Sequence, residues 1–600
     1  MKRVIIILLC LVFTIPLAAQ TEKKIVILHT NDIHSRLIGY APESEYTPLT
    51  TNDDRTVAGF ARMASIIKNE KATNKSTVLV VDAGDFLMGT LFQQLEPVNG
   101  FQLRLMKSIG YDAVCIGNHE FDFGDEKLAD IINSAKREGG IPPVLLSNAI
   151  IDNNDSRDEG LGKLFSENIL QRKLIINRDG LKIGFFSLLG KSAVENAAYA
   201  APVKFSRQIS TAKRMVKELK DKKCDMIIYL SHSGVTREKD GSWGGEDVTL
   251  ARKVKGISVI ISGHTHTKLD KPVMVNGIPV VQTGSYGKYV GRLALTYAGG
   301  KVTVDSYKLI PVDDSIAGDP VVNGLVNDQK KLVSDDVLKP LGMDYDKKVA
   351  EAAFPLECDE DGDYRESNLG PLVADAIYSY INNHTKSGLD VSMVAVGVIR
   401  DNIVPGFQCA PDIFKIMSMG SGNDNVPGYP LSRIYITGHE LKNVLEVLEI
   451  AAKSDPENYC FYSGIRVQYD PDGGFLKKIR KIEITDRKGN TKEVDLSRKN
   501  KTLYSIAANS YMLRYVGIIK KETHGLVNVV PKDAAGKPVK DMNTAVIDID
   551  ESKPGLQEGK EWLALMEFLS SMKDVNGNGV PDISEKYRTA VKTFYTVGSR

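Results

Sequence analysis

Short runs of β-branched and aliphatic residues alternate with helical patterns from about residue 24 to residue 310. No other pattern in the sequence limits the fold as strongly, because this alternation is typical of layered α/β domains. The runs predicted as strands are KKIVILHTND, STVLVVDAGD, DAVCIGNHE, KIGFFSLLG, CDMIIYLSHSG and ISVIISGHTHT.

A chain of 600 residues is too long for one hydrophobic core, so we expect two domains. Residues 321–342 have the pattern of an amphipathic helix that joins two halves. A second α/β region follows and includes a predicted helix over 438–453. We therefore predict a layered sheet domain over 24–315, a linker over 318–345 and a second domain over 346–570.

Polar side chains follow five of the predicted strands at the point where each strand ends, which is where open α/β sheets bind ligands. These side chains are Asp32, His34, Asp85, Asn118, His232, His264 and His266. Imidazole combined with carboxylate favours Zn, Mn, Fe or Co over Ca or Mg. One such histidine alone would be an ordinary loop residue, but seven donors suit two ions roughly 3.5–4 Å apart that share a carboxylate.

The motifs DIH, GD, GNHE, H and GHTH, in this order, resemble those of the calcineurin-like metallophosphoesterases. The stretch GNHEFDFG (117–124) is similar to the 5'-nucleotidase group within that family. The resemblance implies that Asp32, His34, Asp85 and His266 bind one metal. It also implies that Asp85 bridges to a second metal, which Asn118, His232 and His264 complete. Some relatives carry Gln in place of His266, which leaves the metals open.

The same resemblance assigns the side chains that follow Asn118. His119 is similar to the catalytic histidine, which stabilises charge on the phosphoryl group or protonates the leaving oxygen. Asp122 resembles the carboxylate partner that fixes its tautomer. We expect Glu120 and Phe121 to be structural, and Asp82 likewise.

The second half resembles the C-terminal substrate domain of the same group. The matching segments are RESNLGPLVADAI (365–377), VAVGVIRDNI (394–403), YITGHELKNVLE (435–446), YSGIRVQYD (462–470) and AANSYM (507–512). In the family this domain holds a nucleoside between aromatic rings and supplies arginines to phosphate. Arg400 matches one such arginine, and Tyr511 could stack on a base.

Other positions of the second half depart from the family pattern. The acidic stretch CDEDGD (358–363) precedes Glu366 where relatives carry an arginine. Met419 and Ser421 stand where relatives place a stacking Phe and an Asn, and RYVG (514–517) replaces a GGD loop. Three readings stay open: a nucleotidase with an altered base site, a hydrolase of another phosphoester, and a domain kept for architecture or partner binding.

Residues 574–585, DVNGNGVPDISE, match the spacing of a calcium-binding loop. The expected ligands are Asp574, Asn576, Asn578, Asp582 and Glu585. All of them offer oxygen, which suits Ca²⁺, and helical patterns flank the loop. The alternative is a turn rich in Asn and Gly that binds no metal.

The first twenty residues have two basic residues, an apolar core and small residues at its end, which predicts a secretory signal peptide over 1–20. A membrane anchor is the alternative reading. We expect Cys115 and Cys224 to be buried, while Cys358, Cys409 and Cys460 could supply one disulfide of unassigned pairing. The net charge of +1 gives no reason to expect a nucleic acid partner, and we expect no membrane span in the mature chain.

Together these features predict an exported, periplasmic or secreted, hydrolase that releases phosphate from nucleoside 5'-monophosphates or related nucleotides. The resemblance implies two divalent transition metals (Zn, Mn, Fe or Co) and attack on phosphorus by a metal-activated hydroxide. The spacing of the loop at 574–585 adds Ca²⁺ as a further cofactor. The alternatives are a phosphomonoesterase or phosphodiesterase for a non-nucleoside ester, and an exported binding protein with structural metals.

Overall fold

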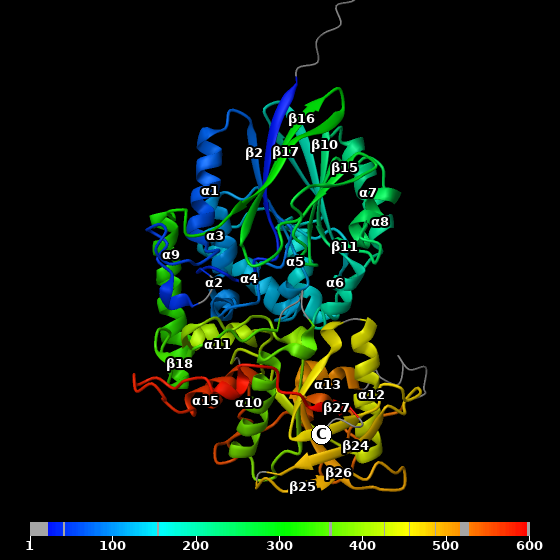
Figure 1. Ribbon diagram of the computed structural model, residues 1–600. Coiled ribbons are helices and arrows are strands. Elements are labelled where there is room, and N and C mark those ends of the chain that lie inside the picture. Colours follow the sequence, from blue (N-terminus) through cyan, green and yellow to red (C-terminus); the bar gives the residue numbers. More distant parts are fainter. Residues whose placement is uncertain are drawn as a thin grey trace, which may run out of the picture.

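The computed structural model describes residues 22–39, 42–152, 155–358, 363–424, 426–454, 456–486, 488–516 and 527–596. The predicted signal peptide (1–20) and residues 359–362 of the acidic stretch lie outside these ranges, as do the side chains of 514–516. Two α/β domains are stacked, with the first above the second in Figure 1. Both predicted regions therefore fold as α/β domains.

The described strands of the first domain build two sheets. The seven-stranded sheet has the order β17 (Lys301–Pro311), β16 (Tyr289–Ala298), β1 (Lys23–Thr30), β2 (Thr77–Asp82), β3 (Ala113–Cys115), β4 (Val144–Leu145) and β6 (Leu170–Gln171). The six-stranded sheet has the order β14 (Val273–Val275), β15 (Ile278–Val281), β13 (Val259–Gly263), β10 (Met226–His232), β8 (Leu181–Leu189) and β7 (Leu174–Arg178). All six predicted strands are confirmed.

The two sheets face each other across a shared apolar layer. Alternate residues of β1, Ile25 and Ile27, point into this layer and meet Phe185 and Ile228 of the other sheet. The residue between them, Val26, points to the opposite face, where α1 (Phe60–Thr73), α3 (Phe101–Ile109) and α4 (Asp125–Glu138) cover the sheet. Strands such as β1, β2, β10 and β13 are buried on both faces because each lies between a second sheet and a layer of helices.

Helices also cover the outer face of the six-stranded sheet, where α7 (Gln208–Asp221) and α8 (Gly245–Lys253) pack. Helix α9 (Pro320–Leu332) then runs along one side of the molecule and reaches the second domain (Figure 1). Turns over Val333–Leu338 and Lys339–Leu341 continue it, which confirms the helix predicted over 321–342.

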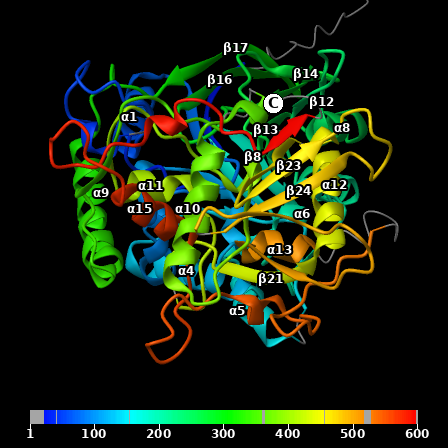
Figure 2. The same ribbon diagram turned by 60° about the horizontal axis from the view of Figure 1, so that its bottom comes forward.

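The second domain contains two four-stranded sheets and β18 (Lys348–Ala352), which pairs with β20 (Gly406–Cys409). Among the described residues, one sheet has the order β21 (Leu431–Thr437), β26 (Leu503–Asn509), β19 (Val391–Ala395) and β22 (Cys460–Ser463). The other sheet has the order β25 (Thr491–Glu493), β24 (Ile479–Thr485), β23 (Ile465–Tyr469) and β27 (Phe594–Thr596). Helices α10 (Leu369–His384), α11 (Ala410–Ile416) and α15 (Glu561–Ser570) gather on one side and α12 (Gly438–Ser454) on the other (Figure 2).

Buried charges fasten the two domains to each other. Arg36 Nη1 lies 2.7 Å from Asp401 Oδ2, and these side chains are only 2% and 1% exposed. Lys415 Nζ lies 3.3 Å from Glu43 Oε1, again between buried side chains. Removing one partner of such a pair leaves an uncompensated charge in the interface, so each pair fixes how the domains meet.

Two further predictions concern membranes and cysteines. Throughout the described ranges, every helix is too short or too polar to cross a membrane. The cysteines in these ranges are free thiols, so the pairing considered among Cys358, Cys409 and Cys460 does not form. Cys115 is fully buried, as expected, whereas Cys224 is partly exposed.

Candidate active site

The loops that follow five strands converge at one edge of the first domain. Strands β1, β2 and β3 are parallel neighbours, as are β10 and β13 in the facing sheet. Their carboxyl ends therefore lie together, and each delivers a polar loop to the same place. Groups of His and Asp side chains whose donor atoms lie within 4.8 Å of one another form there.

The backbone of these loops is held in an unusual conformation. Asp32, His34, Asp85, His264 and His266 have φ values of 50°, 52°, 55°, 81° and 52°. This left-handed region costs of order 1–3 kcal/mol for a residue other than glycine, and it persists only where the surroundings impose it. Hydrogen bonds impose it here, because Asp32 N donates to Gly84 O (2.9 Å) and His34 N donates to Asp85 O (3.0 Å).

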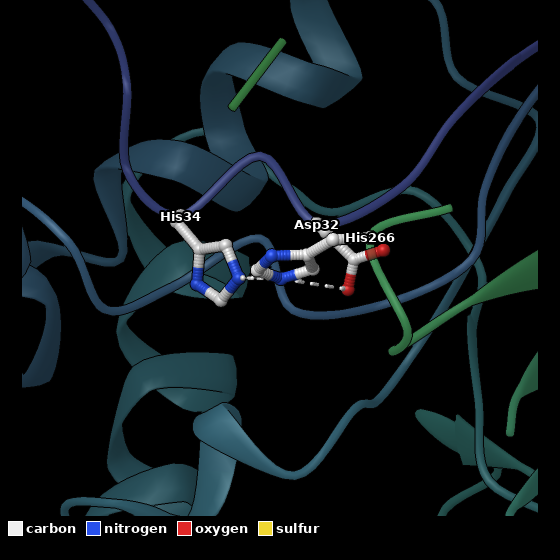
Figure 3. A group of neighbouring side chains, drawn as sticks. All are labelled: Asp32, His34 and His266. Atoms are coloured by element: carbon white, nitrogen blue, oxygen red, sulfur yellow. Dashed lines mark hydrogen bonds and ion pairs between the residues drawn. The ribbon is translucent and has the colours of Figure 1, made fainter. Parts of the chain in front are cut away.

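The first group of donors consists of Asp32, His34 and His266, whose side chains point toward one another (Figure 3). The Nε2 atoms of His34 and His266 are 3.1 Å apart, and His266 Nε2 is 3.9 Å from Asp32 Oδ1. Asp32 also accepts hydrogen bonds from the backbone N of His264 at 3.0 Å through both oxygens. Two imidazole nitrogens facing a buried carboxylate form a donor set that suits a divalent transition metal.

The second group consists of Asp85, His232 and His264. His232 Nε2 lies 3.0 Å from Asp85 Oδ2 and 3.1 Å from the amide oxygen of Asn118. Asp85 also belongs to a group with His34, so its carboxylate lies between the two sets. All seven predicted ligands are thus brought together, and Asp85 occupies the central position.

Backbone carbonyls orient two of these imidazoles. His34 Nδ1 is 2.8 Å from Met88 O, and His232 Nδ1 is 2.9 Å from Ala83 O. A carbonyl only accepts, so each Nδ1 carries a proton, and a metal at the centre of the group would meet each imidazole at Nε2. This is the arrangement by which proteins prepare a histidine to bind a metal.

The charged groups of the pocket shift one another's pKa values. Burial raises the pKa of Asp85, but the His232 and His119 imidazoles outweigh burial and keep this pKa well below its ordinary value. Burial lowers the pKa of His264 to about 3, which leaves this imidazole neutral. Burial lowers the pKa of His232, but Asp85 outweighs burial and raises this pKa to about 10, so a metal would have to displace a proton from this imidazole.

His119 and Asp122 form a pair at the edge of these groups. His119 Nδ1 is 2.6 Å from Asp122 Oδ2, and the His119 backbone N donates to Asp85 Oδ1 at 2.9 Å. Burial alone would lower the pKa of His119, but Asp122 and Asp85 outweigh it and raise this pKa. Part of the His119 side chain, 14%, stays exposed. An imidazole supported by a carboxylate and open to solvent is suited to proton transfer.

Residues expected to be structural lie beneath the pocket. The Glu120 carboxylate accepts hydrogen bonds from the backbone N of Asp85 (3.1 Å), Leu87 (2.9 Å) and Gly117 (2.5 Å), and thereby ties two loops together. Asp82 accepts from Thr30 Oγ1 at 2.6 Å. Phe121 is fully buried in the core.

Two residues near the pocket were missed by sequence reasoning. Asn31 Nδ2 donates to Asp32 Oδ2 (2.6 Å) and to Gly284 O (2.6 Å), so it joins the loops after β1 and β15. The Tyr286 ring centroid lies 5.6 Å from that of His34 and 5.5 Å from that of His266. Asn31 stands directly before Asp32 in the motif, which was the available signal. For Tyr286 the only signal was an aromatic residue between two glycines.

The second domain brings Arg400 to the pocket. Its backbone O accepts from the hydroxyl of Tyr286 at 3.0 Å, and the Tyr286 ring contacts His34. Burial has the largest effect on the pKa values of His34, His119 and Asp122, and the charge of Arg400 lowers all three as well. The domain also presents a stack of aromatic rings. The Tyr511 ring is parallel to that of Tyr429, with centroids 5.4 Å apart and an interplanar angle of 11°. Tyr429 was missed, because its partner was sought near Met419.

Tyr199 of the first domain extends this stack. Its ring lies on that of Tyr429 with a centroid separation of 6.1 Å and an interplanar angle of 24°. The rings of three tyrosines, contributed by both domains, thus form one aromatic column. Met419 is buried and Ser421 is partly exposed at the base of this region.

The loop with the calcium-like spacing packs against β18. Asp574 accepts from the backbone N of Gly577 (2.7 Å) and Gly579 (2.8 Å), and Asp582 accepts from that of Val575 (2.6 Å). Glu351 of β18, which no spacing pattern indicated, accepts from Nδ2 of Asn576 (2.9 Å) and of Asn578 (2.6 Å).

Glu585 lies outside this cluster and pairs with Arg588 at 2.6 Å. The helical pattern before the loop is confirmed by α15. The helix expected after it is wrong, since only a single turn forms over Glu585–Tyr587 and β27 follows, where the chain pairs with β23.

Comparison with known proteins matches two parts of the chain to described families. Residues 25–268 match "Calcineurin-like phosphoesterase", and residues 348–517 match "5'-nucleotidase, C-terminal domain". The apyrase of Aedes albopictus is 27% identical over 81% of this chain and 83% of its own length. The 5'-nucleotidase of Diplobatis ommata is 27% identical over 84% of each chain. The structure of a 5'-nucleotidase precursor from Thermus thermophilus has a TM-score of 0.68 and 20% identity, and covers 96% of this chain and 100% of its own.

Proposed function

Because this chain belongs to the calcineurin-like phosphoesterases and carries a 5'-nucleotidase C-terminal domain, we propose that it releases phosphate from nucleoside 5'-monophosphates or related nucleotides at two metals. The observation that carries the proposal is the convergence of seven donor side chains with Asp85 at their centre, the His119–Asp122 pair beside them and Arg400 tied to the pocket through Tyr286. A hydrolase of phosphoesters needs a cation site, a proton donor and a group that holds the phosphoryl oxygens.

Each side chain of the pocket has a role in this proposal. Asp32, His34, Asp85 and His266 would hold one metal, and Asp85, Asn118, His232 and His264 would hold the second. Divalent ions bound there, among Zn, Mn, Fe and Co, would activate the attacking water and neutralise charge on the phosphoryl group. The Glu120 carboxylate keeps Asp85 in place through the backbone.

His119 and Arg400 act on the substrate itself. His119 protonates the leaving oxygen or stabilises charge on the phosphoryl group, and Asp122 holds its tautomer and orientation. The Arg400 guanidinium donates to the phosphoryl oxygens, for which its planar fork is well shaped. These roles explain why both side chains face the pocket from different domains.

The aromatic column supports recognition of a nucleoside by Tyr511 and Tyr429. Stacking on aromatic rings tolerates any base, because every base has a π-face. A base inserted between two rings needs about 7 Å, twice the contact distance of stacked carbon atoms. The centroids of Tyr429 and Tyr511 are 5.4 Å apart, so a base either moves these rings apart or stacks on an outer face.

That spacing also favours a second candidate, hydrolysis of a non-nucleoside phosphoester. A closed column leaves the metal pocket able to act on a small ester without a base site. A binding protein with structural metals is less consistent with the pocket, because the His119–Asp122 pair serves no purpose in a closed metal shell.

Phosphate release by metal-stripped and reloaded protein tests the function. We expect EDTA to abolish activity and Mn²⁺, Zn²⁺ or Co²⁺ to restore it. Among AMP, other 5'-mononucleotides, UDP-glucose, cyclic nucleotides and aryl phosphates, AMP should be preferred. Tyr511→Ala should raise the KM for AMP by about tenfold, in line with the free energy of stacking, and leave aryl phosphates unaffected.

The outcomes of this experiment separate the candidates. Metal-dependent cleavage without nucleotide preference would establish the non-nucleoside esterase instead. Protein that binds metals but releases phosphate from none of these esters would contradict both. The sequence of residues 1–20 supports an exported setting for the enzyme, which N-terminal sequencing of the exported protein tests by locating its first residue near position 20.

We also propose that the loop at 574–582 binds Ca²⁺ through Asp574, Asn576, Asn578 and Asp582, with Glu351 from β18 in place of Glu585. Calcium takes oxygen ligands in flexible numbers, and extracellular sites of this kind have Kd values of about 10⁻⁴–10⁻³ M. Millimolar Ca²⁺ is therefore expected to raise the Tm by roughly 1–3 °C. Glu351→Gln should reduce this shift and Glu585→Gln should not; the reverse pattern would restore Glu585 as the ligand.

A further inference from the structure

Tyr286 occupies the turn between β15 and β16 in a backbone conformation that suits glycine better. Its φ is 62°, and Gly284 and Gly287 on either side also have positive φ. A tyrosine held in this region costs of order 1–3 kcal/mol, which is tolerated where the side chain is used. Its contacts indicate what that use is.

On one side Tyr286 contacts the metal pocket. Its backbone N donates to Asp32 O at 2.6 Å, so the turn is fastened to the loop after β1. Its ring meets the imidazole of His34 in a tilted contact, with an interplanar angle of 55°, and that of His266 edge-on, at 69°. The ring therefore forms a wall of the pocket and offers no metal ligand of its own.

On the other side Tyr286 contacts the second domain. Its hydroxyl donates to the backbone O of Arg400 at 3.0 Å. The Arg36 guanidinium lies over the ring, 4.7 Å from the centroid, and pairs with Asp401, the residue after Arg400. Because both domains meet at this one ring, Tyr286 links the position of Arg400 to that of the metal pocket.

The backbone of Arg400 is thus held at both ends. Its N donates to Ile416 O at 2.8 Å, and its carbonyl accepts from Tyr286. An arginine that binds phosphate works well when its fork is already oriented, since less freedom is lost on binding. When the backbone is fixed, only the side-chain torsions of Arg400 remain free to move.

We propose that Tyr286 is a positioning residue that sets Arg400 over the metal pocket, through its hydroxyl on the Arg400 carbonyl and through Arg36 and Asp401. The proposal rests on the proposed function in one respect, namely that Arg400 receives the phosphoryl oxygens. Tyr286 would therefore strengthen phosphate binding without affecting metal binding.

Inorganic phosphate binding to the metal-loaded protein, measured by calorimetry, tests this directly. Tyr286→Phe keeps the ring and removes only the hydroxyl, so metal content should not change and Tm should fall by at most about 2–4 °C, the cost of one lost hydrogen bond. The Kd for phosphate and the KM for the ester should both rise about fivefold, the effect of one lost hydrogen bond, while kcat stays within about twofold. In an Arg400→Ala background the same change should have no further effect, because the hydroxyl acts through that arginine.

Tyr289→Phe is the matched control, since Tyr289 lies three residues further along, with its ring against Lys268 at 4.9 Å. It should leave phosphate affinity unchanged. Equal effects of both changes, loss of metal in Tyr286→Phe, or additive effects with Arg400→Ala would overturn the proposal. The measurement uses inorganic phosphate and needs no hydrolysis. If the wild-type protein fails to hydrolyse nucleotides, the proposed function is contradicted, but the effect of Tyr286→Phe on phosphate affinity can still be measured and interpreted.

Discussion

Asp85→Asn is expected to remove most of the bound metal and to lower kcat/KM by at least about 10³-fold. Asp85 belongs to the groups of donors on both sides of the pocket and accepts hydrogen bonds from His232 Nε2 (3.0 Å) and His119 N (2.9 Å). The amide keeps the shape of the carboxylate but not its charge, and a neutral bridge holds two divalent cations poorly. The metal content of the dialysed variant, measured by elemental analysis, should fall below the value of about two metals per chain expected for the wild type.

Asp82→Asn provides the control for this change. Asp82 ends the same strand, is equally buried, and accepts from Thr30 Oγ1 and from Gly84 N, but it faces no donor group of the pocket. Its amide variant should retain the full complement of metal and most of the activity. Metal content that survives in Asp85→Asn, or that falls equally in both variants, would contradict the central position given to Asp85.

His119→Ala is expected to lower kcat at least about 100-fold with metal content unchanged, the usual contribution of a group that transfers protons. The reason lies in the pair that His119 forms with Asp122 at 2.6 Å, at the edge of the pocket and partly open to solvent. Steady-state kinetics and elemental analysis on the same preparation measure both quantities. Asp122→Asn should reproduce part of the loss, about tenfold or more, since the imidazole stays but its orientation is less well fixed.

The metal content of the His119→Ala variant decides whether His119 is a proton donor or a metal ligand. One group of neighbouring donors joins His119 to His34 and Asp85, so the geometry would also permit His119 to bind a metal. Loss of metal in His119→Ala would turn the proposed proton donor into a ligand. His384→Ala, at a surface histidine paired with Glu567, is the control and should change neither quantity.

The part of the site that lies at strand ends could be predicted from the sequence. A strand such as β1 is recognised by its apolar run, and the residues directly after it, Asp32 and His34, are placed by the strand itself. Parallel strands put their carboxyl ends at one edge, so ligands that are distant in sequence had to meet. The sequence could not show that these strands form two facing sheets, because the strands of one sheet and those of two packed sheets have the same apolar runs.

Contacts between segments that are distant in sequence could not be predicted in this way. Tyr429 was missed because its position against Tyr511 depends on how the loop before β21 returns to the sheet, and no local pattern encodes that path. Glu351 lies 225 and 227 residues from the two Asn side chains that it accepts from. Arg400 was found only because it stands in a motif. Each of these pairings is fixed by packing between distant segments, for which a single sequence carries no periodic signal.

The left-handed backbone at Asp32, His34, Asp85, His264 and His266 has a consequence for how this protein tolerates change. Glycine would relieve the strain at each of these positions, and stabilising substitutions are found most readily where a native residue is strained. Variants chosen only for surviving heat should therefore accumulate glycine there first. Such a selection would improve the fold while dismantling the pocket, so directed evolution of this enzyme must score turnover alongside thermal survival.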